Sequence, residues 1–234
     1  MAGNRVIVVG GGVIGVCCAY FLAGRGAQVT VLERDEIGKG ASYGNAGTIA
    51  PGHAPLNKPG RVIQALTHML DPTTPLYIPP RWDPALARWL WTFRAHCTAA
   101  YVRKNMQVLG PMGHASRELF DRMVSEEDLD CLYRPDGYYE VCRTDRGLDT
   151  VCADANMVRG YGYRPEMLSG DNLRAREPAL RNEILGGVYH PEGATCHPYR
   201  FVTELTERIR RHGGTVLPGQ TVVEVLSHRG QVRG

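Results

Sequence analysis

The sequence lacks any C-x-x-C pair, and its seven cysteines are odd in number and irregularly spaced. Zinc sites and disulfide frameworks use cysteines at regular spacings, so neither a metal site nor a disulfide framework is expected here. Unpaired cysteines indicate a reducing compartment, and we therefore expect a cytoplasmic protein. The seven residues are Cys17, Cys18, Cys97, Cys131, Cys142, Cys152 and Cys196.

Long runs of like charge are also missing. The densest basic run is "RIRRH" at 208–212, and the net charge of the 234 residues is only +3. A run this short is typical of the solvated end of a helix, so no nucleic-acid partner is expected. With 43% hydrophobic and 22% charged residues, the chain has enough apolar sequence for one large domain or two smaller ones.

Charged residues are absent between Val6 and Gly24. A stretch of this kind can belong to a signal peptide or a membrane span, but five glycines interrupt it. Neither a sizeable basic leader nor a cleavage-like site accompanies it. We therefore predict a short strand, a turn and a buried helix.

Three of these glycines form the pattern Gly10-x-Gly12-x-x-Gly15 between "RVIVVG" and a helix-like segment, and the strand-like "QVTVLE" follows. In such a unit Gly10 permits a tight turn, Gly12 lets the backbone approach a pyrophosphate, and Gly15 lets the helix approach the strand. The helix N-terminus offers N–H groups to phosphates. Glu33 ends the second strand, where an acid accepts hydrogen bonds from ribose hydroxyls and disfavours NADP. The pattern predicts a dinucleotide-binding unit.

The stretch "GASYGNAGTIAPG", residues 40–52, favours FAD over NAD. It holds glycines and small residues where an NAD enzyme would usually continue into a helix. We expect this backbone to run along an extended cofactor, with Ser42 donating to a phosphate oxygen and Asn45 reaching a polar edge of the flavin. Three neighbouring main-chain groups would join Asn45, those of Ala46, Gly47 and Thr48. A flexible linker is the alternative for this stretch.

The segment "S-x-x-NAG-x-I-x-PG", followed by "APLNKPG", resembles the D-amino-acid-oxidase superfamily of FAD-dependent oxidoreductases, and within it the D-amino acid dehydrogenase branch. Later segments resemble that branch in the same order, namely "REPAL", "LGGVYHPEGATCHPYRF" and "HGGTVLPGQTVVEV". The resemblance implies an α/β fold: a Rossmann-type FAD-binding domain with a parallel, glutathione-reductase-like sheet. It also implies an inserted α+β substrate domain at 61–194, which divides the FAD-binding domain into 1–60 and 195–234.

The resemblance completes the expected cofactor site. It adds a main-chain contact from Val223 to the adenine end of FAD, together with residues that flank the glycine turn, the ribose acid and the flavin loop. The expected set is Gly10, Gly12, Val13, Ile14, Gly15, Glu33, Arg34, Ser42, Asn45, Ala46, Gly47, Thr48, Ile49 and Val223. His53 directly follows the flavin loop and is a candidate to face the substrate, although a hydrogen bond to local backbone is the more common role for such a histidine.

The inserted segment reads as a mixture of helices and strands. We expect a short helix at 61–70, a stiff proline-rich connection at 71–84, and helices that continue to about Val124. "CLYRPDGYYEVCR" predicts a hairpin that turns at 135–137, with a helix at 145–162 and a strand at 184–191 to follow. Large apolar residues here are expected in the core rather than in a pocket, among them Trp89, Trp91, Phe93, Met106, Met112 and Met123.

The last forty residues return to the pattern of the first. Phe201, Val202, Leu205 and Ile209 have helical spacing, and "TVLPG" predicts a third parallel strand before a terminal hairpin begins in "TVVEVLSHRGQVRG". By resemblance, the remainder of both domains would follow residue 234, including the groups that hold an amino acid's carboxylate. The chain is thus expected to be C-terminally truncated relative to the family, and no catalytic residue is assigned.

The resemblance implies FAD-dependent oxidative deamination of an amino acid, of the D-amino acid dehydrogenase type. Hydride would pass from the substrate Cα to flavin N5. Electrons would then leave to a quinone or another carrier. A peripheral contact of the protein with the inner face of the membrane stays open as a further expectation. Two other readings stay open. One is a catalytically incomplete FAD-binding fragment, or a subunit that needs a partner chain. The other is an NAD enzyme, which the glycine-rich stretch at 40–52 disfavours.

Overall fold

The computed structural model describes residues 4–55, 57–59, 81–229 and 231–232, and the chain divides into two compact units. Unit 1 comprises Met1–Ile49, Glu118–Asp136 and Ala194–Gly234, and unit 2 comprises Ala50–Arg117 and Gly137–Gly193. The expected helix at 61–70 and most of the proline-rich connection lie outside the described residues. Segment 118–136, expected within the inserted domain, belongs to unit 1.

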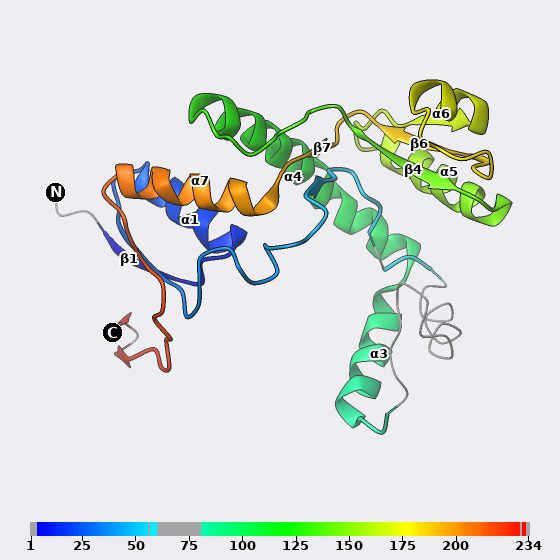
Figure 1. The fold of residues 1–234 in the computed structure, drawn as a ribbon. Helices are drawn as coiled ribbons and strands as arrows, with labels where there is room; N and C mark the ends of the chain where they lie inside the picture. Colours follow the sequence, from blue (N-terminus) through cyan, green and yellow to red (C-terminus); the bar gives the residue numbers. More distant parts are fainter. Residues whose placement is uncertain (1–3, 56, 60–80, 230, 233–234) are drawn as a thin grey trace. The chain divides into compact units, whose positions relative to one another are not determined.

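Unit 1 is built on a parallel sheet with the strand order β1-β2-β8. Strand β1 (Arg5–Val9) leads through the glycine turn into α1 (Val13–Ala23) and then into β2 (Gln28–Leu32). Helix α7 (Pro198–Arg211) precedes β8 (Thr215–Leu217), and α1 and α7 lie on the same face of the sheet (Figure 1). The predicted strand–turn–helix–strand unit, the later helix and the third parallel strand are all confirmed.

The core of unit 1 lies between the sheet and these two helices. Successive strand residues point to opposite faces, so only one set of side chains in each strand enters this core. Val31 is fully buried and pairs with Val216 of β8, whereas Ile7 and Val9 of β1 are more than half exposed on the other face. The residues of α7 predicted from helical spacing are all buried, namely Phe201, Val202, Leu205 and Ile209.

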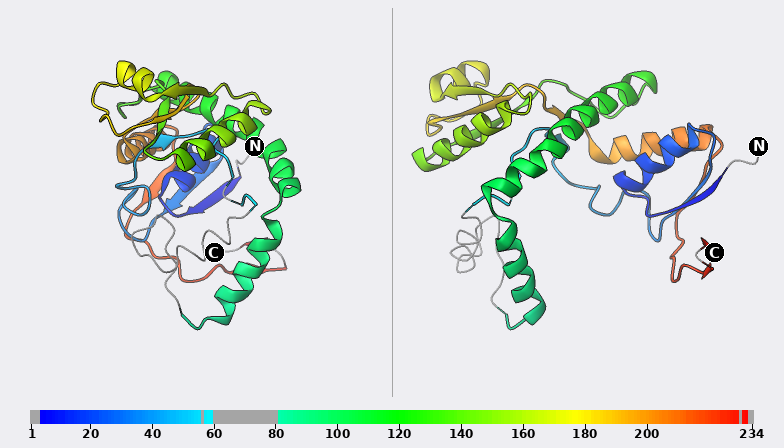
Figure 2. Two further views of the ribbon diagram at one scale, coloured as in Figure 1. Left: turned by 90° about the vertical axis from the view of Figure 1, so that its right-hand side faces the viewer. Right: turned by 180° about the vertical axis from the view of Figure 1, so that it is seen from behind.

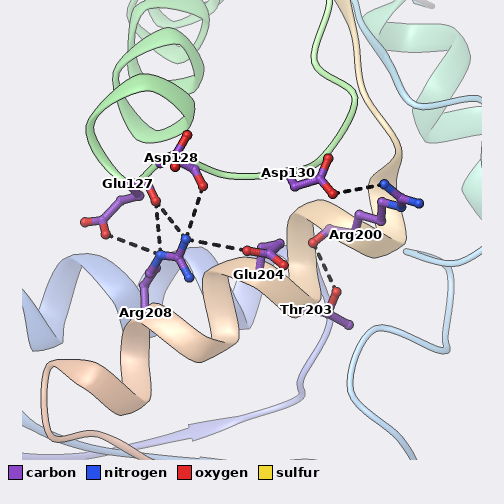
Figure 3. Close-up of polar contacts among 7 residues, drawn as sticks. All are labelled: Glu127, Asp128, Asp130, Arg200, Thr203, Glu204 and Arg208. Atoms are coloured by element: carbon purple, nitrogen blue, oxygen red, sulfur yellow. Dashed lines mark hydrogen bonds and ion pairs between the residues drawn. The ribbon is translucent and has the colours of Figure 1, made fainter.

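Arg208 lies in this packed region, although the "RIRRH" run predicted a solvated helix end. Arg208 is 8% exposed, whereas Arg210 and Arg211 lie on the surface. Figure 3 shows its guanidinium between α7 and the turn that follows α4 (Ala99–Glu126). Nη2 donates to the carbonyl oxygens of Glu127 at 2.8 Å and of Asp128 at 3.2 Å. The prediction was wrong for Arg208, because a buried arginine needs partners that the local sequence does not reveal.

Four two-residue strands complete unit 1. β3 (Thr48–Ile49) pairs antiparallel with β7 (Ala194–Thr195), which joins the predicted flavin loop to the segment before α7. β9 (Ser227–His228) pairs antiparallel with β10 (Gln231–Val232). The terminal hairpin therefore forms, but its paired part is shorter than the predicted first arm.

Unit 2 contains an antiparallel sheet with the order β4-β6-β5. Its strands are β4 (Tyr138–Cys142), β5 (Glu166–Ser169) and β6 (Gly186–His190), and its helices include α5 (Asp145–Arg159) and α6 (Gly170–Arg176). Helix α5 runs along this sheet (Figures 1 and 2). Helix α3 (Pro84–His96) and the first part of α4 also belong to unit 2.

Two predictions for this region were wrong. Strand β4 pairs with β6, not with residues 131–134, so the expected hairpin around 135–137 does not form. The tryptophans expected in the core are exposed: Trp89 by 55% and Trp91 by 73%. Met106 and Met123 are buried as predicted, but Met112 is exposed.

Candidate cofactor site

The glycine turn between β1 and α1 depends on close backbone contact. Gly10 has φ of +105°, a conformation that residues with a Cβ rarely adopt. A Cβ added at Gly15 would lie 1.9 Å from the carbonyl oxygen of Gly10, so only glycine lets the helix approach the strand this closely. Gly12 precedes the first helical residue in extended conformation and provides no side-chain cap. The turn thus leaves backbone N–H groups at the start of α1.

Ser42 reaches this helix start from the glycine-rich loop. Its Oγ accepts a hydrogen bond from the N–H of Val13 at 2.9 Å, and the serine is 8% exposed. A hydroxyl that accepts one hydrogen bond can still donate its own hydrogen. Ser42 therefore ties the loop to the N-terminus of α1 while retaining a donor for a phosphate oxygen.

Glu33 is held by backbone donors at the end of β2. Its Oε1 accepts from the N–H of Asp35 at 3.0 Å, and its Oε2 accepts from the N–H of Gly11 at 2.6 Å. These two donors, with the Asp35 N–H the stronger cause, hold the pKa of the Glu33 carboxyl below its ordinary value. An ionised carboxylate has about four lone-pair sites, so it can accept further hydrogen bonds from ribose hydroxyls.

Asn45 and Gly47 shape the loop at 40–49. Asn45 donates through Nδ2 to the carbonyl of Ala41 at 3.2 Å and accepts the N–H of Gly47 through Oδ1 at 2.9 Å. Gly47 has φ of +64°, and a Cβ there would lie 1.9 Å from the carbonyl oxygen of Cys196. Gly47 is therefore required in part because the loop packs against the backbone at Cys196. The sequence did not reveal this contact.

A cavity of about 170 Å³ in unit 1 brings six of the predicted residues together. They are Val13, Ser42, Asn45, Gly47, Thr48 and Ile49. Small-molecule sites typically enclose roughly 300–1,000 Å³, so this cavity is large enough for only part of a dinucleotide. Cys196 also lines it, and burial raises the pKa of that thiol to about 11, so it stays protonated at neutral pH and offers no nucleophile.

Other predicted residues lie outside this cavity. Ala46 lines a second cavity of unit 1, of about 870 Å³, together with Asn45, Tyr43 and Tyr199. Ile14 and Val223 are 77% and 92% exposed. Arg34 is exposed and forms an ion pair with Asp35 at 2.9 Å.

His53 lies in unit 2, where it is close to a carboxylate that the sequence analysis missed. Its Nδ1 is 2.9 Å from the carbonyl oxygen of Ala54, in line with the local-backbone role considered for it. Its Nε2 is 3.8 Å from Oε1 of Glu140, and Nε2 of His190 is 3.1 Å from Oε2 of the same carboxylate. The His190 hydrogen bond is the main reason that the pKa of Glu140 lies below its ordinary value.

The partner of His190 could not be found from the sequence, because Glu140 lies fifty positions away on the neighbouring strand. Tyr138 stacks on the His190 ring at a centroid distance of 4.7 Å. The Tyr138 hydroxyl is buried and has no hydrogen-bond partner among the described residues. Within the same described part of the chain, no group of three or more His, Cys, Asp or Glu side chains is placed to hold a metal ion.

Comparison with known proteins agrees with this geometry. The family described as FAD-dependent oxidoreductase (DAO) matches residues 5–234. The chain belongs to this family. It is 33% identical over 235 residues to a D-amino acid dehydrogenase of Methylobacterium nodulans and 34% identical over 231 residues to that of Methylobacterium radiotolerans. These alignments cover 98% and 97% of this chain but 56% and 55% of the relatives, so the chain spans little more than half their length.

Solved structures show the same fold for this member of the DAO family. Glycine oxidase from Bacillus cereus has a TM-score of 0.66 at 21% identity, over 98% of this chain and 51% of the oxidase. L-amino acid deaminase from Proteus myxofaciens has a TM-score of 0.66 at 16% identity, over 99% of this chain and 42% of the deaminase. The α/β fold with a parallel sheet is therefore that of FAD-dependent oxidoreductases, and this chain covers about half of it.

Proposed function

We propose that unit 1 binds FAD and that the chain serves the oxidative deamination of an amino acid, of the D-amino acid dehydrogenase type. The observation that carries this proposal is the meeting of the glycine turn and the 40–49 loop at the start of α1. Gly15 allows the backbone approach, and Ser42 joins the loop to Val13. The names of the relatives supply the substrate class.

The residues present fit an FAD molecule. The N–H groups at the start of α1 and the hydroxyl of Ser42 would hold the pyrophosphate, and Glu33 would hold the ribose. Asn45 and the main chain of Ala46, Gly47 and Thr48 would contact the flavin, whereas Val223 would contact the adenine end. Ser42, Asn45, Gly47 and Thr48 line the 170 Å³ cavity, Ala46 lines the second cavity, and Val223 is exposed, so these positions are open to a ligand.

The proposed reaction removes two electrons and two protons from the Cα–N bond of the amino acid. The resulting imine is hydrolysed by water to a 2-oxo acid and ammonia. FAD, when bound, would supply the hydride acceptor, and a quinone or another carrier would take up the electrons. The residues of this chain would orient the cofactor and exclude water around it, and no catalytic residue is assigned among them. Unit 2 would form part of the substrate domain, with His53 as a candidate to face the substrate.

A second candidate function is that of an FAD-binding fragment, or of a subunit that needs a partner chain for catalysis. One observation favours it: the parallel sheet of unit 1 leaves Ile7 and Val9 exposed on one face. Under this alternative the chain would bind FAD without turning over an amino acid.

A visible spectrum of the purified 234-residue chain separates these functions. Flavin absorbance that bleaches anaerobically with a D-amino acid is expected for the dehydrogenase. Flavin absorbance without bleaching supports the fragment, and a folded but colourless protein that does not take up added FAD contradicts both.

A matched pair of variants locates the cofactor. Glu33→Gln removes the ionised acceptor and should weaken FAD binding at least about 10-fold, since hydrogen bonds to charged groups contribute roughly 1.5–3 kcal/mol. Glu36→Gln, three residues away and exposed, should leave the affinity unchanged. Flavin fluorescence titration measures both, and equal losses would show that Glu33 does not contact the cofactor.

A further inference from the structure

Two hydrogen-bond acceptors face each other in unit 2, on the side chains of His53 and Glu140. Nδ1 of His53 lies 2.9 Å from the carbonyl oxygen of Ala54, and a carbonyl only accepts, so Nδ1 carries the hydrogen of the neutral ring. Nε2 of the same ring then holds a lone pair, and it lies 3.8 Å from Oε1 of Glu140. This separation is too long for a hydrogen bond, and neither atom has a hydrogen to give. A donor placed between them would satisfy both.

The carboxyl group of Glu140 is ionised and held in place through its other oxygen. Oε2 accepts a hydrogen bond from Nε2 of His190 at 3.1 Å, and this bond is the main cause that lowers the pKa of Glu140. His190 is 6% exposed, and Tyr138, its cross-strand partner, stacks on its ring. The buried histidine thus fixes the carboxylate and leaves Oε1 for another partner.

The space beside these groups has the size and charge that suit one ammonium group. A cavity of about 10 Å³ is lined by His53, Glu140, His190 and Asp154, among others. This is close to the smallest volume that holds a water molecule, and an ammonium group is similarly compact. Lys58 pairs with Asp154, so its charge is already matched. While both histidines are neutral, the group as a whole carries one net negative charge, which favours a cation over water.

We propose that Glu140 and His53 bind the amino group of the amino acid, with one N–H donated to Oε1 and another to Nε2. An ammonium group has three donors and no acceptor, so it matches two facing acceptors. A metal ion is the other cation to consider, but among the described residues no group of three or more ligating side chains is placed to hold one. The side chains of His53 and Glu140 are 56% and 31% exposed, so a ligand can reach both from the surface.

One consequence rests on the proposed function. Oxidation of an amino acid to an imine removes a hydride from Cα and one proton from the ammonium nitrogen, as the C=N bond forms. The lone pair of His53 Nε2 would take up that proton, and Glu140 would stabilise the resulting imidazolium. His190 would act through Glu140 as a positioning residue. Binding of the amino group itself requires neither FAD nor turnover.

Side-chain NMR of the 234-residue chain tests the amino-group site, with methylammonium chloride as the probe. At a pH of about 8 and without the probe, the nitrogen signals of His53 should show a hydrogen on Nδ1 and none on Nε2. Methylammonium should then shift the Nε2 signal in a saturable way. Tetramethylammonium chloride at the same concentrations should leave it unchanged, because that cation has no N–H to donate.

A matched pair of variants tests the role of Glu140. Glu140→Gln keeps the size of the side chain and an acceptor for His190 but removes the charge. The methylammonium concentration at half-saturation should therefore rise at least about 10-fold. Glu183→Gln removes an exposed charge elsewhere in unit 2 and should change that concentration less than about 2-fold. Circular dichroism checks that both variants are folded.

A second variant tests the other acceptor at an exposed position, where folding is easily retained. His53→Phe removes the lone pair of Nε2 and should raise the half-saturation concentration about 3-fold or more. The backbone amide signal of Glu140 follows the binding in this variant.

Several results would overturn the proposal. A hydrogen on His53 Nε2 in the probe-free protein would mean that an imidazolium already fills the gap. The absence of a saturable shift, or an equal shift with tetramethylammonium, would leave only a general attraction of cations. Equal effects of Glu140→Gln and Glu183→Gln would place the binding elsewhere. These results are independent of flavin binding by unit 1, which the visible spectrum measures separately.

Discussion

Gly15 shows how one residue sets the geometry of the cofactor site. The glycines of the turn have different physical roles: Gly10 adopts a positive φ, whereas Gly15 occupies a place where the Gly10 carbonyl leaves no room for a Cβ. Gly47 combines both requirements, since its φ is +64° and Cys196 O would lie 1.9 Å from an added Cβ. At Gly15 and Gly47 the side chain is missing because a backbone oxygen occupies its place, whereas at Gly10 the positive φ alone favours glycine.

Replacing Gly15 by alanine should therefore destabilise unit 1. The methyl group must push the start of α1 away from β1, and overpacking of this kind typically costs about 1–3 kcal/mol. Gly24→Ala is the matched control at the other end of α1, because Gly24 has φ of −63° and an added Cβ would make only ordinary contact at 3.4 Å. Urea unfolding followed by circular dichroism measures both. Equal midpoints for the two variants would contradict the steric role of Gly15.

At the scale of elements, Arg208 joins α7 to the turn after α4. Its guanidinium donates to the carbonyls of Glu127 and Asp128, and carboxylates of Glu127 and Glu204 lie 3.7 and 3.5 Å away (Figure 3). Asp128 has φ of +50°, so the turn it forms is one that few side chains favour. Arg208 thus satisfies carbonyl groups that the end of α4 leaves without helical partners.

Arg208→Leu should lower the free energy of unfolding by about 2–4 kcal/mol. The substitution leaves partly buried carboxylates without their cation and carbonyl oxygens without donors, and both losses are costly. Arg211→Leu, on the exposed side of the same helix, should change stability by no more than about 0.5 kcal/mol. Thermal and urea unfolding of the pair measure the difference. A loss for Arg208→Leu as small as that of the control would mean that this arginine does not hold the turn.

At the scale of the whole molecule, the described residues cover the parallel sheet of unit 1 on one face only. Parallel sheets are usually covered on both faces, and Ile7, Val9 and Leu217 are instead 56%, 60% and 41% exposed. Because parallel sheets are seldom left open on one face, we expect such a surface to be met by further protein.

The uncovered face should make the 234-residue chain self-associate as its concentration rises. Ile7→Lys places a charge in the middle of that face and should shift the association to higher concentration, several-fold or more. Val108→Lys in unit 2 is a matched control, because Val108 is 58% exposed but lies on a helix. Light scattering after size-exclusion chromatography measures both variants. The same shift of the association concentration in both variants would indicate a general gain in solubility. No shift in either variant would show that this face does not drive self-association.

The sequence predicted the elements whose contacts are local. Strand β1, the glycine turn, α1 and β2 were all recognisable, because the constraints on Gly10 and Gly15, a positive φ and the nearby Gly10 carbonyl, arise within the turn itself. Helix α7 was recognisable from the spacing of Phe201, Val202, Leu205 and Ile209. The hairpin around 135–137 was predicted wrongly, since a turn signal cannot show that β4 pairs with β6 some fifty residues later.

What the sequence determined by itself was the dinucleotide turn, the choice of FAD and the family, because these depend on short patterns of residue types. Only the tertiary structure decided the burial of Arg208, the contact of His190 with Glu140 and the exposure of Trp89 and Trp91. Each of these depends on which distant segment folds against the residue. Whether a residue is buried, and which residue it contacts, depends on segments that are distant in the sequence and close in space. A single sequence shows only which residues adjoin along the chain.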